Sequence, residues 1–375
     1  MALRLVTARQ LNHDLARIEC HDLHAYQYYG GYQEMKQLRV GVVGLGWWGK
    51  LIVDQLRQCP SVTVVVATDR VPEPGKRFVA ERGIAWVDDY DHLLAIAGID
   101  AVILCTPHAT HTGQILQAAE KGKHVFCEKP LALLAQEARL SIEAMKSRGL
   151  TLGLGHEKRF EPPIIEALAR VRRGDIGIPL QMEANFNQDK FLGMSQNNWR
   201  FEETDAPAGP LTATGIHLID LAVAVLGRAK AVTAALGRSS GQLRNGDTLG
   251  MLVEFEKGGH ALIGAMLATP FSGRFALYGS TGWIDVRDNA HPEHPQGWTM
   301  RISRRGFAEE VFSFPSHPAV RDNLEAFAAS ILDGADYPIP TDDMEANVSI
   351  LEAVVTSTRI GQRVQIFSTS RPPQL

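Results

Sequence analysis

The stretch 38–49, LRVGVVGLGWWG, decides the fold of this chain. Its apolar run Val40–Val43 predicts a strand that is buried on both faces of a sheet. Gly44, Gly46 and Gly49 follow in the spacing G-x-G-x-x-G, and mainly apolar residues at helical spacing come next. A strand, this glycine spacing and a helix in direct succession predict a site for the pyrophosphate of a dinucleotide.

Each residue of this loop has an expected task. Gly44 permits the tight turn, Gly46 lets the backbone approach the pyrophosphate, and Gly49 lets helix and strand pack closely. Trp47 and Trp48 open the helix, whose free N–H groups and dipole favour an anion at that end. A plain turn is the alternative for such a pattern outside this context.

Asp69 ends the second strand-like run, 20 residues beyond Gly49. A carboxylate there is expected to accept hydrogen bonds from the adenosine ribose and to repel a 2′-phosphate, which favours NAD. Arg70 leaves NADP open, because a guanidinium beside that site can stack on adenine or bind the 2′-phosphate. The alternative role for Asp69 is to cap the next helix.

Strand-like and helical runs alternate up to about residue 155, which predicts a doubly wound parallel sheet. The strand-like runs are Val40–Val43, Val62–Ala67, Ala101–Cys105, His124–Cys127 and Leu150–Leu154. Beyond about residue 175 the runs are closely spaced and joined by turns, which predicts a mainly antiparallel sheet that is open on one face. Those runs are Leu180–Phe186, Leu249–Phe255, His260–Ala268, Arg274–Gly279 and Trp283–Arg287, with closing helices at Asn323–Leu332 and Asp343–Thr358.

The fold class is therefore α/β plus α+β, with a Rossmann domain first. We expect an N-terminal extension at 1–37, an NAD(P)-binding domain at 38–160, and a substrate-binding and oligomerisation domain at 161–375. For residues 1–37, a start upstream of the true initiator and a helix that packs on a partner subunit both remain open.

Composition excludes several classes of protein. With 375 residues, a net charge of −4 and no apolar run near the ~20 residues that span a bilayer, neither nucleic acid nor a membrane is an expected partner. His291 and His294 share a loop and could imitate a pair of metal ligands, but no metal site is expected. We expect a cytoplasmic protein whose cysteines are reduced thiols: Cys20, Cys59, Cys105 and Cys127.

Two further groups of polar residues follow strand-like runs. Thr106-Pro107-His108 comes after Ala101–Cys105, with His111 just beyond, and Glu128-Lys129-Pro130 comes after His124–Cys127. Ligands of open α/β sheets bind outside the carboxyl ends of the strands, so both groups are expected to face the cofactor. A lysine there can hold a substrate hydroxyl and stabilise its developing negative charge. The alternative for Lys129 is a surface ion pair with Glu128.

These residues resemble the glucose–fructose oxidoreductase/inositol dehydrogenase family, Gfo/Idh/MocA. The resemblance covers nearly everything from residue 38 onward, and it continues through Arg159-Phe160 with Pro162, Trp199-Arg200, Gly215-Ile216-His217 with Asp220, and the tail Asn323–Gly361. It implies hydride transfer between NAD(P) and a secondary alcohol or carbonyl carbon of a sugar, polyol or related ring compound. It also implies that Lys129 and His217 are the catalytic pair. A histidine suits an acid/base role because imidazole ordinarily titrates near working pH.

The chain departs from this family at one position. The family usually has an aspartate four residues before the histidine, where this chain has Ala213 between Thr212 and Thr214. A hydroxyl cannot raise the basicity of a histidine as a carboxylate does. Three alternatives follow: Lys129 and His217 act alone, the substrate is unusual, or catalysis is lost. The last would make the protein a non-catalytic NAD(P)-binding sensor or regulator.

The resemblance also implies a substrate pocket lined by His156, Arg159, Lys190, Trp199, Arg200, Thr214 and His217. Its cations suggest an anionic substrate such as a carboxylated ring diol or sugar acid, although any one of them can instead be solvated on the surface. The open C-terminal sheet suggests a homodimer or homotetramer.

Overall fold

The computed structural model describes residues 36–367. The interpretations of residues 1–35 and of Cys20 therefore lie outside the described part. Cys59, Cys105 and Cys127 are free thiols. Among the described residues, no helix is both long enough and apolar enough to cross a membrane.

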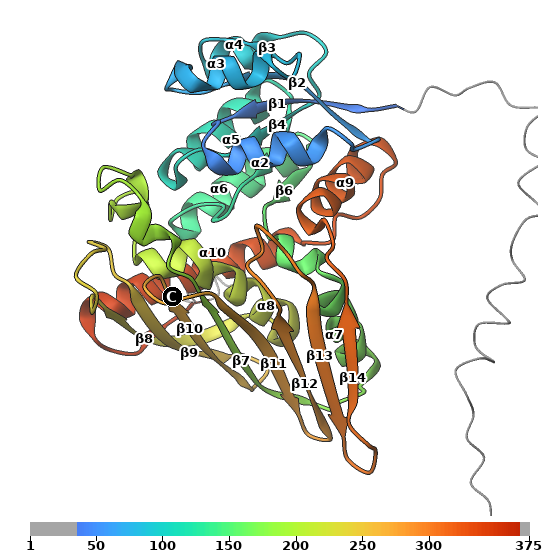
Figure 1. The fold of residues 1–375 in the computed structure, drawn as a ribbon, viewed down its shortest axis with the longest axis vertical. Coiled ribbons are helices and arrows are strands. Elements are labelled where there is room, and N and C mark those ends of the chain that lie inside the picture. The colour runs from blue at the N-terminus through green and yellow to red at the C-terminus, as the bar shows by residue number, and fades with distance from the viewer. Residues whose placement is uncertain (1–35, 368–375) are drawn as a thin grey trace, which may run out of the picture. The chain divides into compact units, whose positions relative to one another are not determined.

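A six-stranded parallel sheet forms the first half of the described chain and confirms the predicted doubly wound arrangement (Figure 1). Its strands, in spatial order, are β3 (Ala85–Trp86), β2 (Val62–Thr68), β1 (Leu38–Val43), β4 (Ala101–Leu104), β5 (His124–Cys127) and β6 (Leu152–Leu154). Its helices are α2 (Trp47–Leu56), α3 (Pro72–Ala80), α4 (Tyr90–Ala95), α5 (His111–Glu120) and α6 (Ala135–Lys146), with a 3₁₀ turn η1 (His108–Thr110). The strand order reverses between β1 and β4, and a crevice opens at such a reversal.

The apolar runs of this sheet are buried on both faces, as their continuity predicts. In β4, Val102 and Leu104 pack into one core cluster with Ile115 of α5. The alternating residues Ala101 and Ile103 pack into a second cluster on the other face. Successive side chains of a strand point to opposite faces, so alternate residues of β4 pack against the helices on opposite faces of the sheet.

A nine-stranded sheet forms the second half and confirms the predicted open, mainly antiparallel sheet. Only the pairing of β7 with β10 is parallel. Its strands, in spatial order, are β14 (Glu310–Phe314), β13 (Trp298–Arg304), β12 (Gly282–Asp288), β11 (Ser272–Gly279), β7 (Pro179–Asn187), β10 (His260–Met266), β9 (Thr248–Phe255), β8 (Ala229–Gly237) and β15 (Val364–Gln365). Sequence analysis places no strands at β8, β13 or β14.

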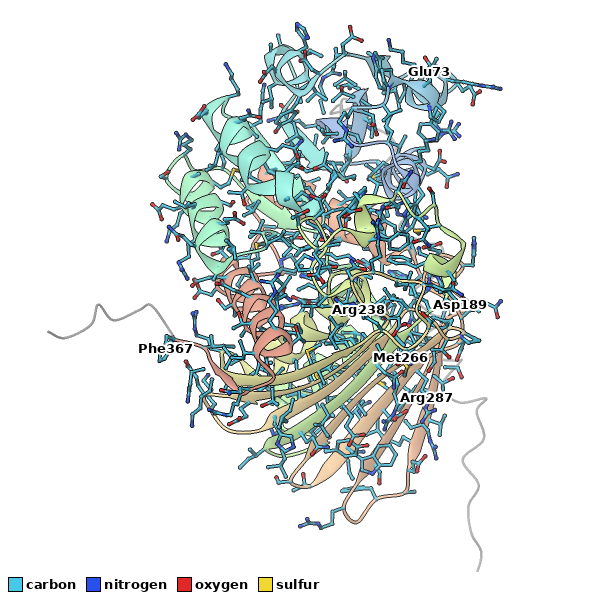
Figure 2. The ribbon with its side chains drawn as sticks, turned by 90° about the vertical axis from the view of Figure 1, so that its left-hand side faces the viewer. Glu73, Asp189, Arg238, Met266, Arg287 and Phe367 are labelled. Carbon is cyan, nitrogen blue, oxygen red and sulfur yellow. The ribbon has the colours of Figure 1, made fainter. Side chains whose placement is uncertain are left out.

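Helices cover one face of this sheet, and the other face is open. The covering elements are α7 (Pro162–Arg173), α8 (Ile216–Leu226) and α10 (Thr341–Ile360), and they enclose the largest core cluster. The open face carries the exposed Leu262 and Met266, which alternate along β10 with residues of the core cluster. Met266 and Arg287 mark this face in Figure 2.

The C-terminal part of the chain returns to the first sheet. Helix α9 (Ala319–Leu332) packs on α2 and on the β1–β2 part of the parallel sheet (Figure 1). Its Phe327 is 1% exposed, and its ring centroid lies 5.6 Å from that of Phe126 on β5. Residues far apart in the sequence thus share one hydrophobic core.

We expect Phe327→Ala to lower the free energy of unfolding by about 3–5 kcal/mol, because it leaves a cavity between α9 and the parallel sheet. Leu140→Ala is the control, since Leu140 is 51% exposed on α6. Urea denaturation followed by circular dichroism measures both. Equal effects of the two substitutions would contradict the role assigned to this contact.

Candidate active site

A cleft of about 840 Å³, part of it open to solvent, lies between the carboxyl ends of the parallel strands and the loops of the second sheet. From the first half it is lined by Trp47, Trp48, Cys105, Thr106, His108, Glu128 and Lys129. From the second half it is lined by Glu157, Phe186, Gln188, Lys190, Phe191, Trp199, Arg200, Ala206, Gly209, Thr212, Ala213, Thr214, His217, His291, Pro292 and Glu293. Most of the predicted site residues therefore meet at one place.

The glycine loop has the geometry that a pyrophosphate requires. Gly44 has φ +92°, and a Cβ there would lie 2.6 Å from the carbonyl oxygen of Cys105. A Cβ on Gly49 would overlap the carbonyl oxygen of Gly44, whereas a Cβ on Gly46 would meet nothing within 4 Å. No side chain caps the start of α2, so its first N–H groups remain available to an anion. The residues present therefore fit a dinucleotide phosphate.

Asp69 fastens this loop to the end of β2. Its Oδ2 accepts a hydrogen bond from the Leu45 N–H at 2.5 Å, and its Oδ1 accepts one from the Val71 N–H at 2.8 Å. Val71, not Asp69, occupies the N-cap position of α3. Arg70 is exposed beside it.

Lys129 follows β5 and is held from the opposite half of the molecule. Its ammonium donates hydrogen bonds to the carbonyl oxygens of Ala213 at 2.8 Å and Thr212 at 3.3 Å. Burial lowers the pKa of Lys129 to about 8. Burial, together with the negative charge of Glu157, raises the pKa of Glu128 to about 8. The surface ion pair considered for Lys129 is therefore not its environment.

His217 is the second residue of α8, which follows directly on a π-helical turn at Leu211–Gly215. Its ring is almost fully buried, and its centroid lies 5.6 Å from that of His156. Burial and the charge of Lys129 hold the pKa of His217 well below its usual value. The imidazole is removed from water beside a cation, and both conditions disfavour its protonated form.

Glu157 is a candidate that sequence analysis missed. It lies in the 3₁₀ turn η2 (Glu157–Phe160), and its Oε2 is 3.6 Å from Nδ1 of His217. Neither of these two buried atoms has a hydrogen-bond partner in the described part of the chain. No local pattern marks Glu157, because the histidine that it faces comes 60 residues later.

The structure places the predicted substrate ligand Arg159 outside the cleft lining. Its guanidinium donates two hydrogen bonds to the carboxylate of Asp220, at 2.7 and 2.8 Å, and one to Asp343 at 2.8 Å. His156 also lies behind the lining, with Nε2 4.0 Å from Asp220. We propose structural roles for Arg159 and His156, since buried carboxylates engage the first and the second packs behind His217.

The remaining predicted residues surround the mouth and floor of the cleft. Lys190 pairs with Glu293, and its ammonium lies 3.5 Å from the ring centroid of Trp47. The guanidinium of Arg200 lies 4.3 Å from the ring centroid of Trp199. The contact between Lys190 and Trp47 joins the phosphate loop to the second half of the protein.

Two predicted residues, Thr214 and His111, have polar partners within the protein itself. The hydroxyl of Thr214 donates a hydrogen bond to the Phe186 carbonyl oxygen at 3.0 Å. The buried ring of His111 lies within hydrogen-bond distance of the carbonyl oxygens of Pro130 and Thr106, so Pro107 and His111 shape the strand end from outside the lining.

The loop that carries His291 and His294 closes one side of the cleft. His291 Nε2 is 2.7 Å from Oε1 of Gln188. Within residues 36–367, no three histidine, cysteine or carboxylate side chains are grouped to hold a metal ion.

A glycine loop at the carboxyl edge of a parallel sheet, facing a half-buried lysine and a buried histidine, defines a dinucleotide-dependent oxidoreductase. The chain belongs to the Gfo/Idh/MocA oxidoreductase family: residues 38–156 match its NAD-binding Rossmann fold, and residues 164–285 match its C-terminal domain. This confirms the resemblance inferred from the sequence.

Similar proteins cover most of the chain. The scyllo-inositol 2-dehydrogenase (NAD(+)) of Bacillus subtilis is 29% identical over 343 residues, which span 88% of this chain and 96% of that protein. The 1,5-anhydro-D-fructose reductase of Ensifer adhaerens is 29% identical over 301 residues, 78% of this chain and 88% of that protein. The fold resembles that of the aldose-aldose oxidoreductase from Caulobacter crescentus, with a TM-score of 0.78, 24% identity, and coverage of 88% of this chain and 100% of that one.

We expect Gly46→Val to abolish NAD binding while leaving the fold intact, because the new side chain points into the open space that suits a pyrophosphate. Gly250→Val is the control, since a Cβ at that strand position also meets nothing within 4 Å. Titration with NAD, followed by tryptophan fluorescence, measures binding. Unchanged binding by the Gly46 variant would remove the phosphate-loop assignment.

Proposed function

We propose that this protein transfers a hydride between NAD and a secondary alcohol or carbonyl carbon of a ring polyol or sugar. One observation carries the proposal: the half-buried Lys129 and the buried His217 line the same cleft as the end of the glycine loop. A substrate hydroxyl held between them would lie at the carboxyl edge of the parallel sheet, where a dinucleotide binds in this type of fold.

The residues of the cleft support a simple division of labour. NAD, when bound, accepts or returns the hydride. Lys129 holds the reacting oxygen, and its positive charge stabilises the negative charge that develops there. With a pKa of about 8, Lys129 can also take up or release the proton near neutral pH. His217, as a neutral imidazole, accepts or donates a hydrogen bond at the same oxygen.

NAD is the preferred cofactor in this proposal. Asp69 ends β2 with both oxygens fixed by backbone N–H groups, which still leaves acceptor capacity for a ribose hydroxyl. A 2′-phosphate would meet this carboxylate directly. The exposed Arg70 is the one group that favours NADP.

The pairing of charged groups in the cleft favours an uncharged ring over an anionic one. Three acidic side chains line the cleft together with three basic ones: Glu128, Glu157 and Glu293 with Lys129, Lys190 and Arg200. Lys190 is paired with Glu293, so it is not free for a substrate anion. Arg200 has no hydrogen-bonded acceptor for its guanidinium among residues 36–367, and a ring carboxylate would have to bind there.

We also propose that the open face of the nine-stranded sheet associates with another copy of the chain. The exposed Leu262 and Met266 support this, because apolar side chains on an open sheet form a surface that association would cover.

We expect the unaltered protein to bind NAD more tightly than NADP, and Asp69→Asn to narrow or reverse the difference. The amide removes the negative charge but keeps an acceptor for the Leu45 N–H. Asp91→Asn, an exposed position in the same half, is the control for net charge. Dissociation constants for both cofactors measure the effect, and a parent that prefers NADP would show that Arg70 dominates.

We expect kcat for alcohol oxidation to rise as the pH increases through about 8, because Lys129 must be neutral to accept the proton. In the reductive direction kcat should fall over the same range, since the ammonium donates the proton. Glu128 titrates in this range as well, so the change of kcat with pH reports the coupled titration of Lys129 and Glu128.

Lys129→Ala should lower kcat by about 10²–10⁴-fold and remove the change of kcat with pH near 8. His217→Ala should lower kcat but keep this dependence on pH. Lys146→Ala, exposed on α6, is the control. Parental rates in both cleft variants would contradict the assignment, and a parent that binds NAD without turning over any polyol would favour a sensor.

A further inference from the structure

We propose that Glu157 is the positioning residue for His217: it fixes the proton on Nδ1 of the imidazole and so leaves Nε2 to meet the substrate. This role rests on the proposed hydride transfer. It also explains how the chain can work with Ala213 in the turn before the histidine.

The geometry singles out this pair of atoms. Glu157 Oε2 and His217 Nδ1 are 3.6 Å apart, and both are buried. Each lacks another hydrogen-bond partner in the described chain, and two orphaned buried polar atoms that face each other are costly unless a proton joins them. A small side-chain rotation closes the remaining distance to a hydrogen bond.

The carboxylate that faces His217 belongs to Glu157 of η2, and not to the residue four positions before the histidine. Position 213 lies four residues before His217 and carries only a methyl group, although it lines the same cleft. Glu157 approaches instead from η2, just after the last parallel strand. Gly155, two residues before it, leaves room for the Glu128 carboxylate, because a Cβ there would lie 2.5 Å from Glu128 Oε1.

The surrounding charges are consistent with a shared proton. Besides Glu157, the imidazole of His217 faces Lys129, His156 and Lys158, whose charges lower its pKa. These cations and the burial make an imidazolium unfavourable, so the ring is neutral and carries a single proton.

Glu157 itself faces Lys129, Lys158, Asp220 and Glu128. Burial raises the pKa of its carboxyl, while Lys129 and Lys158 oppose that rise. Since the charge of Glu157 also raises the pKa of Lys129, replacing Glu157 by a neutral residue should move the rise of kcat for oxidation to lower pH.

The proposed bond sets the hydrogen-bonding role of Nε2. With N–H at Nδ1 donating to Glu157, Nε2 has a lone pair that accepts a hydrogen bond from the substrate hydroxyl and orients it until Lys129 takes up the proton. An amide at position 157 would instead donate to Nδ1 and force the proton onto Nε2. A comparable change of tautomer at a catalytic histidine lowers kcat by about 10⁴-fold in a well-studied triad, so a large loss is expected from a nearly isosteric change.

The test compares Glu157→Gln with Glu161→Gln. Glu161 is also buried, lies on the same segment and pairs with Lys158, yet it does not line the cleft. We expect Glu157→Gln to lower kcat by about 10²–10⁴-fold with an unchanged NAD dissociation constant, and Glu161→Gln to keep the parental kcat. Glu157→Asp, which retains the charge, should lose less than Glu157→Gln.

Two further readouts separate positioning from simple packing. The ¹⁵N chemical shifts of the His217 ring should report N–H at Nδ1 in the parent and at Nε2 in Glu157→Gln. Adding Ala213→Asp to Glu157→Gln should restore part of kcat, because a carboxylate four residues earlier lies on the same side of the helix. An active parent whose Glu157→Gln variant keeps its kcat and its tautomer would overturn this role alone. A parent that binds NAD but turns over no polyol would overturn the proposed function instead.

Discussion

The ammonium of Lys129 connects the two halves of this protein at the point where its chemistry is expected. It sits at the end of a parallel strand, and its hydrogen-bond acceptors are the carbonyl oxygens of Thr212 and Ala213 in the π-helical turn that precedes His217. This contact sets the separation between lysine and histidine. It also places a positive charge beside the imidazole, so the protonation states of both groups depend on the same packing.

Much of the fold could be predicted because buried parallel strands leave continuous apolar runs. The bounds of β5 match the sequence prediction, and those of β1, β2 and β4 differ from it by a few residues. Strand β8 is different: it is rich in alanine, which has weak strand propensity, and its place depends on pairing with β9. The return of α9 to the first sheet is likewise a long-range packing event without a local signal.

The candidate site divides in the same way. Residues in a fixed spacing or at strand ends, such as Gly46 and Lys129, could be predicted from the sequence, because local structure dictates where they lie. Arg159 was not, since its partners Asp220 and Asp343 are 61 and 184 residues away. Only the folded chain distinguishes an arginine that is neutralised by buried carboxylates from one that faces a ligand. Glu157 could not be recognised for the same reason.

The return of α9 has a consequence for how this protein can be divided. Its residues Leu324, Phe327 and Ala328 belong to the same core cluster as Val40 and Ile103 of the parallel sheet. A fragment that ended near residue 160 would therefore expose an apolar face that the intact chain covers. The two halves of the described chain are thus not interchangeable modules: a chimera that swaps the second half must bring along a helix whose inner surface suits this particular sheet.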